Sequence, residues 1–165
     1  MQPQHPLWTN LFRTGPDWIT EAAELWRRTP LFRDLPKRQC RALTAAMHLR
    51  SFTADEPVFR QGDVGAGAVL IRRGRVAIRA GGRDLAELGP GDFFGEVALV
   101  AEERRTADAV CLEASELVFF LRPDLEEWLG RAPRHGTRFM SNLAGILATR
   151  LRQANHQLAD ADTTP

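Results

Sequence analysis

The spacing of hydrophobic residues predicts helices in the first segment of the chain, residues 1–48. In "TGPDWITEAAELWRR" the apolar residues recur three or four positions apart, so that they share one face of a helix. These residues are Ile19, Ala22, Leu25 and Trp26. The stretch "DLPKRQCRALTAAMHL" repeats the spacing with Cys40, Leu43 and Met47. Two N-terminal helices are therefore expected.

The pattern changes in residues 49–122, where glycines separate short apolar runs. The runs "AVLIRRG", "RVAIRA", "DLAEL" and "ELVFFL" have strand length, and Val76 and Ile78 alternate with other residues as in a strand with one buried face. Many short strands with frequent turns predict a small antiparallel barrel or jelly roll.

Residues 123–160 return to a helical pattern. "RPDLEEWLGR" begins with a proline and carries acidic residues in its first turns, which suits a helix N-terminus. A longer helix is predicted to follow, with an apolar stripe spaced almost like a coiled-coil seam. The stripe consists of Met140, Leu143, Leu147, Leu151, Ala154 and Leu158. It could pack on its own barrel or on the helix of a second copy, or its first part could pack on the barrel and its later part on a second copy.

Taken together, the three segments predict an α+β fold that is mainly β: an antiparallel jelly roll of about eight strands, flanked by N-terminal helices and a long C-terminal helix. The 165 residues are enough for one domain of this kind. A net charge of +1 argues against a non-specific nucleic-acid binder, which needs a clear basic excess. No apolar run approaches the ~20 residues of a membrane helix, and no signal pattern opens the chain, so a cytoplasmic protein is expected.

Metal and enzyme chemistry find little support in the residue pattern. Cys40 and Cys111 lie far apart, and the four histidines are scattered, so we expect reduced thiols and no metal site. No Ser-His-Asp set and no P-loop motif is recognisable, which predicts a protein that is not an enzyme.

The stretch "FGEVALVAEERRTADAV" carries the candidate chemistry. "EVALV" reads as one turn of helix inside the strand-rich segment, and Gly95 before it would let the backbone approach a ligand closely. Arg105 could bind a phosphate through charge-assisted hydrogen bonds, and Thr106 adds a hydroxyl. Glu96 can only accept hydrogen bonds, so a sugar hydroxyl suits it. Phosphate and sugar in one pocket indicate a nucleotide, although Glu96 and Arg105 could instead form a purely structural pair.

These motifs resemble those of the cyclic nucleotide-binding domain family, which includes bacterial catabolite activators, protein kinase A regulatory subunits and cyclic-nucleotide-gated channels. "PLFRDLP" resembles the family's entry helices, "EPVFRQGDVGAGAVLIRRGRVAI" its early strands, and "LGPGDFFGEVAL" followed by "RRTA" its phosphate-binding cassette. The resemblance covers most of the chain, from about residue 31 to residue 158. It implies that the ligand is cAMP or cGMP.

The resemblance also implies roles for single residues. Glu96 would bind the ribose 2′-hydroxyl and Arg105 the cyclic phosphate, while Asn155 and Arg152 on the last helix would face the base, with Arg150 as another candidate. The full implied binding set is Phe94, Gly95, Glu96, Val97, Ala98, Arg105, Thr106, Ala107, Arg152 and Asn155. One departure is Asp108, which stands where many members carry Thr or Ser and would repel a phosphate if it faced the pocket.

The function implied by the resemblance is cyclic nucleotide sensing, in which ligand capture moves the C-terminal helix. The implied partners are a second copy of the chain, through that helix, and an unknown protein effector. The chain stops at Pro165, too soon for the DNA-binding domain of the family's transcription regulators. Two alternatives remain: a degenerate dimerisation scaffold in which Arg105 pairs with Glu96 or Asp108, or the sensor part of a larger regulator, channel or transporter.

Overall fold

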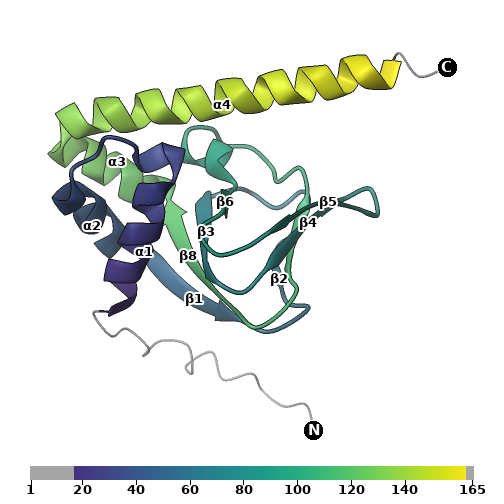
Figure 1. Ribbon diagram of the computed structural model, residues 1–165, viewed down its shortest axis with the longest axis horizontal. Helices are drawn as coiled ribbons and strands as arrows, with labels where there is room; N and C mark the ends of the chain where they lie inside the picture. The colour runs from purple at the N-terminus through teal and green to yellow at the C-terminus, as the bar shows by residue number, and fades with distance from the viewer. Residues whose placement is uncertain (1–16, 163–165) are drawn as a thin grey trace, which may run out of the picture.

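Helices lie at both ends of the chain and strands lie between them in the computed structural model, which describes residues 17–162 (Figure 1). The helical elements are α1 Asp17–Arg28, η1 Pro30–Phe32, α2 Lys37–Ala45, η2 Glu96–Leu99, α3 Arg122–Arg131 and α4 Pro133–Asp162. The strands are β1 His48–Phe52, β2 Pro57–Phe59, β3 Gly67–Arg73, β4 Val76–Ala80, β5 Arg83–Leu88, β6 Phe93–Phe94, β7 Asp108–Cys111 and β8 Ser115–Leu121. Residues 1–16, which belong to the first predicted segment, lie outside the described residues.

The strands of residues 17–162 form two four-stranded antiparallel sheets. One sheet has the order β1-β8-β3-β6, and the other has the order β2-β7-β4-β5. The two sheets pack face to face around buried aliphatic and aromatic side chains such as Val69, Ile71 and Leu117. This arrangement confirms the predicted fold class: a jelly roll of eight strands with N-terminal helices and a long C-terminal helix.

A second cluster of buried side chains joins α1, η1, α2, α3 and the start of α4 to the sheet that contains β3 and β8. Trp26 lies at its centre, stacked on Phe32 with ring centroids 5.0 Å apart and in edge contact with Phe120 of β8 at 6.2 Å. The buried stripe of α1 contains Ala22 and Trp26 as predicted, but Trp18 joins them, while Ile19 and Leu25 are only partly buried. The stripe follows a spacing of four residues, which keeps side chains above one another on a helix.

A buried arginine fixes α1 to the roll. The side chain of Arg72 on β3 is 8% exposed and contacts two carboxylates, Glu21 on α1 and Glu116 on β8. Its Nε donates a hydrogen bond of 2.9 Å to Oε2 of Glu21. Because a desolvated cation is stable only with such partners, this cluster ties the position of α1 to that of the sheet.

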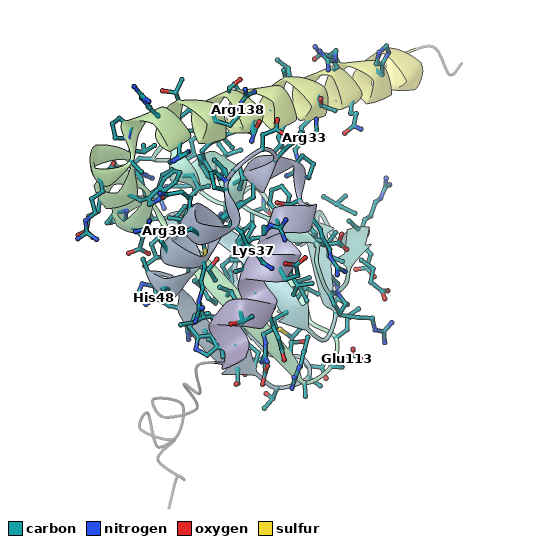
Figure 2. The ribbon with its side chains drawn as sticks, turned by 60° about the vertical axis from the view of Figure 1, so that its left-hand side comes forward. Arg33, Lys37, Arg38, His48, Glu113 and Arg138 are labelled. Carbon is teal, nitrogen blue, oxygen red and sulfur yellow. The ribbon has the colours of Figure 1, made fainter. Side chains whose placement is uncertain are left out.

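Among the side chains of helix α4 that the structure describes, the buried ones all lie in its first half. Phe139 and Leu143 are buried among the other helices, and Nδ2 of Asn142 donates to the main-chain oxygens of Leu31 at 3.1 Å and Arg33 at 2.8 Å. Figure 2 shows Arg33 close beneath this half of the helix. Further along, Leu151 is 63% exposed. The predicted apolar stripe is therefore divided between contact with the chain's own helices and an open face.

Three further observations concern membrane helices, cysteines and metal ligands. Among the described residues, no helix combines the length and the apolar character that crossing a membrane requires. Cys40 and Cys111 are buried free thiols, and burial raises the pKa of both. Within residues 17–162 there is also no cluster of His, Cys, Asp and Glu side chains that could hold a metal ion.

Candidate functional site

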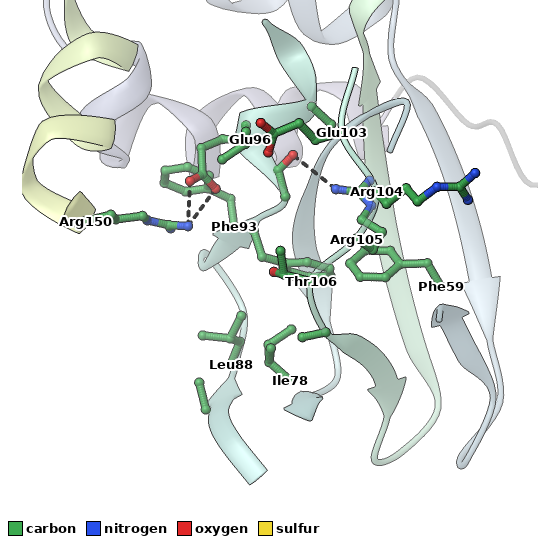
Figure 3. Close-up of a pocket in the computed structure, with 16 residues that line it drawn as sticks. Phe59, Ile78, Leu88, Phe93, Glu96, Glu103, Arg104, Arg105, Thr106 and Arg150 are labelled. Carbon is green, nitrogen blue, oxygen red and sulfur yellow. Dashed lines mark hydrogen bonds and ion pairs between the residues drawn. The ribbon is translucent and has the colours of Figure 1, made fainter. Parts of the chain in front are cut away.

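A cavity of about 380 Å³ opens between the η2 turn, the strands β4 and β5, and the segment that leads into β7 (Figure 3). All of the residues in the 94–107 segment that were predicted to bind ligand line it. These are Phe94, Gly95, Glu96, Val97, Ala98, Arg105, Thr106 and Ala107. The volume lies within the range of small-molecule sites.

The turn before η2 shapes the floor of this pocket. Strand β6 ends at Phe94, and Gly95 then adopts a left-handed backbone conformation with φ of +74°, which glycine tolerates best. The predicted helical turn is present as η2, in which Glu96, Ala98 and Leu99 are buried. A Cβ atom at position 95 would lie 2.4 Å from Nη1 of Arg105, so a side chain there would displace the arginine.

Arg105 is held from several directions. Its Nη1 donates to the main-chain oxygen of Gly95 at 3.2 Å, and its Nη2 donates to that of Gly67 at 2.8 Å. The guanidinium carbon lies 4.2 Å from the centroid of the Phe59 ring. The main chain of Arg105 is fixed as well, because its N–H donates to the oxygen of Asp63 at 2.8 Å. The orientation of this guanidinium is thus set by the protein itself.

The charge of Arg105 is not neutralised by a contact within the described residues. No carboxylate of residues 17–162 lies within ion-pair distance of it. Burial lowers the pKa of the Arg105 guanidinium, and the negative charges of Glu96 and Asp63 act in the opposite direction. A partly desolvated cation whose remaining N–H groups face a cavity is a binding site for an anion.

Glu96 is buried in the wall of the same pocket and pairs with α4. Its side chain is 1% exposed, and Nη1 of Arg150 lies 2.7 Å from Oε2 and 2.6 Å from Oε1. Only the contact with Oε2 has hydrogen-bond geometry, and no other described residue donates to Oε1. The Arg150 guanidinium also lies over the Phe93 ring, 5.7 Å from its centroid. Oε1 therefore lacks a hydrogen-bond donor, and a ligand hydroxyl could supply one if the Arg150 side chain moved aside.

The structure contradicts the pairing that a degenerate scaffold would require. Glu96 binds Arg150 rather than Arg105. Oδ1 of Asp108 accepts a hydrogen bond of 2.6 Å from the main-chain N–H of Gln61, and Asp108 does not line the pocket. Asp108 therefore holds the loop after β2 and does not face the pocket, where it would repel a phosphate.

The two predicted base contacts on α4 are not brought into this pocket. Arg152 lines a separate cavity of about 620 Å³ between η1 and α4 and donates to Oγ1 of Thr149 at 3.2 Å. Asn155 is exposed and lines neither cavity. Successive residues turn by roughly 100° around a helix. Arg150 lines both cavities and reaches Glu96, whereas Arg152 lines only the second. Arg150, the lesser candidate on sequence grounds, is the α4 residue that reaches the site.

The apolar wall of the pocket was missed by sequence reasoning. Its residues come from strands far apart in the chain: Phe59, Ile78, Ala86, Leu88 and Phe93. Nothing in the cassette motif points to them, because strand pairing brings them together rather than local spacing. The alternation of Val76 and Ile78 was the one local signal, since residues two apart lie on the same face of a strand.

Comparison with known proteins gives a consistent set of relatives. The family model described as cyclic nucleotide-binding domain matches residues 49–132. The cyclic AMP receptor protein of Thermus thermophilus is 36% identical over 135 residues, which cover 79% of this chain and 61% of that protein. A cGMP-dependent protein kinase of Toxoplasma gondii is 31% identical over 99 residues, which cover 60% of this chain but only 10% of the kinase.

Solved structures agree with these matches. The crystal structure of the Thermus thermophilus catabolite activator protein superposes with a TM-score of 0.72 at 35% identity, over 81% of this chain and 63% of that one. A cyclic nucleotide-binding domain from Methylobacillus flagellatus has a TM-score of 0.74 over 90% of this chain and 86% of that one, and its 23% identity establishes a shared fold. The chain thus spans less than two thirds of its Thermus relative.

Proposed function

Because this chain belongs to the cyclic nucleotide-binding domain family, we propose that it is a regulatory module that captures cAMP or cGMP in the pocket beside η2. The role is regulatory rather than catalytic. In support, the match to the Toxoplasma kinase covers 10% of that protein, and the other relatives compared are a receptor protein and an activator protein.

The observation that carries the proposal is the state of Arg105. This guanidinium faces the pocket, two main-chain oxygens and an aromatic ring hold it in place, and no carboxylate of residues 17–162 pairs with it. A purely structural arginine in such a position would be expected to have an acidic partner. The cyclic phosphate of the nucleotide would supply the missing negative charge.

The rest of the pocket suits the other parts of a cyclic nucleotide. Oε1 of Glu96 can accept a hydrogen bond from the ribose 2′-hydroxyl. The rings and alkyl groups of Phe93, Ile78 and Leu88 offer an apolar surface to the purine. The Thermus relative is a cyclic AMP receptor protein, which makes cAMP the first ligand to test. The hydroxyl of Thr106, which lines the pocket, could instead accept a hydrogen bond from the amino group of guanine in cGMP.

The ion pair between Glu96 and Arg150 provides a physical link from ligand to helix. Arg150 belongs to the half of α4 that has few buried side chains, so this pair is a main attachment of that half to the pocket. A ribose hydroxyl at Glu96 would compete with or reorient Arg150, and a purine beside Phe93 would change the surface on which Arg150 lies. If the nucleotide binds more tightly when α4 is in one position than when it is in another, binding shifts α4 toward the favoured position and so produces a signal.

Calorimetric titration with cAMP and then cGMP tests the proposal directly. Binding is expected with at least one of them, and hydrogen exchange of residues 146–156 should change when it binds. In Arg150→Ala this part of α4 should already exchange faster without ligand, and the change on binding should shrink. Absence of heat with either nucleotide, at a protein concentration that would detect a dissociation constant of about 0.1 mM, would overturn the proposal and favour an interaction scaffold.

We further propose that the open half of α4 forms a homodimer with the same helix of a second copy. Leu147 still packs against the helical cluster, and Leu151 and Ala154 continue the apolar stripe beyond it as exposed residues, Leu151 with 63% of its surface accessible. Leu151→Arg is expected to shift the protein from dimer to monomer in sedimentation velocity, because it places a charge in the seam. Leu85→Arg, at a leucine 61% exposed on β5, should leave the dimer intact; a wild-type monomer would contradict the proposal.

The activity of the whole regulator is a separate proposal, since the chain spans 61% of its Thermus relative. We expect the module to act on a protein effector or on an attached output domain through α4. An affinity capture that compares ligand-bound with ligand-free protein would identify such an effector, and equal capture in both states would contradict ligand control.

A further inference from the structure

A phenylalanine outside the cassette motif lies directly against the guanidinium that faces the pocket. The ring of Phe59, the last residue of β2, has its centroid 4.2 Å from the guanidinium carbon of Arg105 (Figure 3). This distance is well inside the ~6 Å within which a cation is attracted to the face of an aromatic ring. The contact joins two segments that are 46 residues apart in the sequence.

The position of Phe59 is itself well determined. The pairing of β2 with β7 is irregular between Pro57 and Phe59, and such an irregularity changes the direction of the side chains beside it. The ring then packs against Phe94, with centroids 5.7 Å apart and planes tilted by 55°. It is also packed against the buried cluster between the two sheets. Phe59 is thus a firm support and not a mobile surface ring.

The main-chain contacts of Arg105 leave one movement open, which the ring opposes. The oxygens of Gly95 and Gly67 bind N–H groups at the edge of the guanidinium. Contacts at an edge resist sliding in the plane but resist tilting out of the plane only weakly. A ring against one face of the group opposes that tilt and keeps the remaining N–H groups directed into the pocket.

We propose that Phe59 is a positioning residue for anion recognition, whose ring face holds Arg105 in the orientation that binds the phosphate of the ligand. This inference rests on the proposed function of the pocket. It assigns to the end of β2 a part in ligand binding that the cassette alone does not contain. The ring would touch the arginine and need not touch the phosphate.

A double-mutant cycle in calorimetric titrations with cAMP or cGMP, whichever binds the wild type more tightly, tests this role. Phe59→Leu keeps an apolar side chain but removes the ring face, and it should weaken binding by roughly threefold to thirtyfold. Phe59→Tyr keeps the face and should bind within about twofold of the wild type. In an Arg105→Ala background, Phe59→Leu should change the affinity by less than about twofold, because the group that it positions is gone.

A matched control separates positioning from packing. Phe119 is also partly buried against the cluster between the sheets and also lies under an arginine, 5.4 Å from the guanidinium carbon of Arg50, but it does not line the pocket. Phe119→Leu should therefore leave the affinity unchanged. Wild-type affinity in Phe59→Leu, or an equal loss with and without Arg105, would overturn the inference.

Failure of the proposed function would look different. If the wild type binds neither nucleotide, the function and the inference both fall. If the wild type binds and Arg105→Ala weakens binding, but Phe59→Leu does not, only the role of Phe59 is lost. Should Phe59→Leu unfold, as seen by circular dichroism, the comparison of Phe59→Tyr and Phe59→Met decides: equal affinities would contradict the inference.

Discussion

Replacing Arg105 with alanine is expected to weaken cyclic nucleotide binding by roughly tenfold to a hundredfold. A hydrogen bond to a charged group contributes about 1.5–3 kcal/mol, and about 1.4 kcal/mol corresponds to a factor of ten in affinity. The guanidinium faces the pocket without an acidic partner among the described residues, so a bound phosphate would depend on it. Calorimetric titration of the variant beside the wild type measures the effect.

The neighbouring arginine provides the control. Arg104 is exposed at the rim of the pocket, and its Nη1 donates to the main-chain oxygen of Gly62 at 2.8 Å. Arg104→Ala should bind nucleotide within about twofold of the wild type, because the substitution removes a screened charge from the rim. Equal losses in the two variants would mean that the pocket attracts its ligand by general positive charge. Undiminished binding in Arg105→Ala would refute the assignment of the phosphate site.

Replacing Trp26 with alanine is expected to lower the free energy of unfolding by about 3–5 kcal/mol, the usual effect of removing a large buried aromatic side chain. Trp26 is fully buried and contacts Phe32, Phe93 and Phe120, so that one side chain joins α1, η1, β6 and β8. Urea unfolding of the unliganded protein, followed by circular dichroism, measures the change.

A conservative substitution at the same position checks the cause. No described residue accepts a hydrogen bond from Nε1 of Trp26, so phenylalanine would remove volume but no hydrogen bond. Trp26→Phe should therefore lose less than half as much stability as Trp26→Ala. A loss below about 1 kcal/mol in Trp26→Ala would show that the helical cluster contributes little to the folding of the roll.

The fold could be predicted from the sequence because its signals are local. Glycine-separated apolar runs between two helical segments indicate a jelly roll with flanking helices, and strands and helices occur in that order. Apolar spacing also identified the buried face of α2, where Cys40 and Leu43 are fully buried. The spacing predicted Ile19 rather than Trp18 for the buried face of α1, because spacing alone does not show which side of the helix meets Phe32 and Phe120.

The candidate site likewise has one part that the sequence predicts and another that it does not. The predicted residues at 94–107 form a continuous motif, and its resemblance to the family implied that they surround one pocket. Phe59 and Leu88 come to the pocket through strand pairing, and spacing along the chain does not reveal such pairing. On α4 the sequence indicated a helix near the ligand but not how that helix is rotated about its axis. Arg150 lines the candidate pocket, and Arg152, two residues later, lines only the second cavity.

The two glycine carbonyls and the ring that hold Arg105 also affect the balance between stability and affinity. An arginine side chain loses about 2 kcal/mol of rotamer entropy when it is immobilised. Here that loss belongs to folding, because the groups that hold Arg105, on Gly67, Gly95 and Phe59, are parts of the chain itself. The contacts that order the side chain offset this cost within the folded protein, and a ligand meets an arginine that needs no further ordering. The pocket should accordingly bind its anion with a smaller entropic penalty than a pocket lined by a flexible arginine.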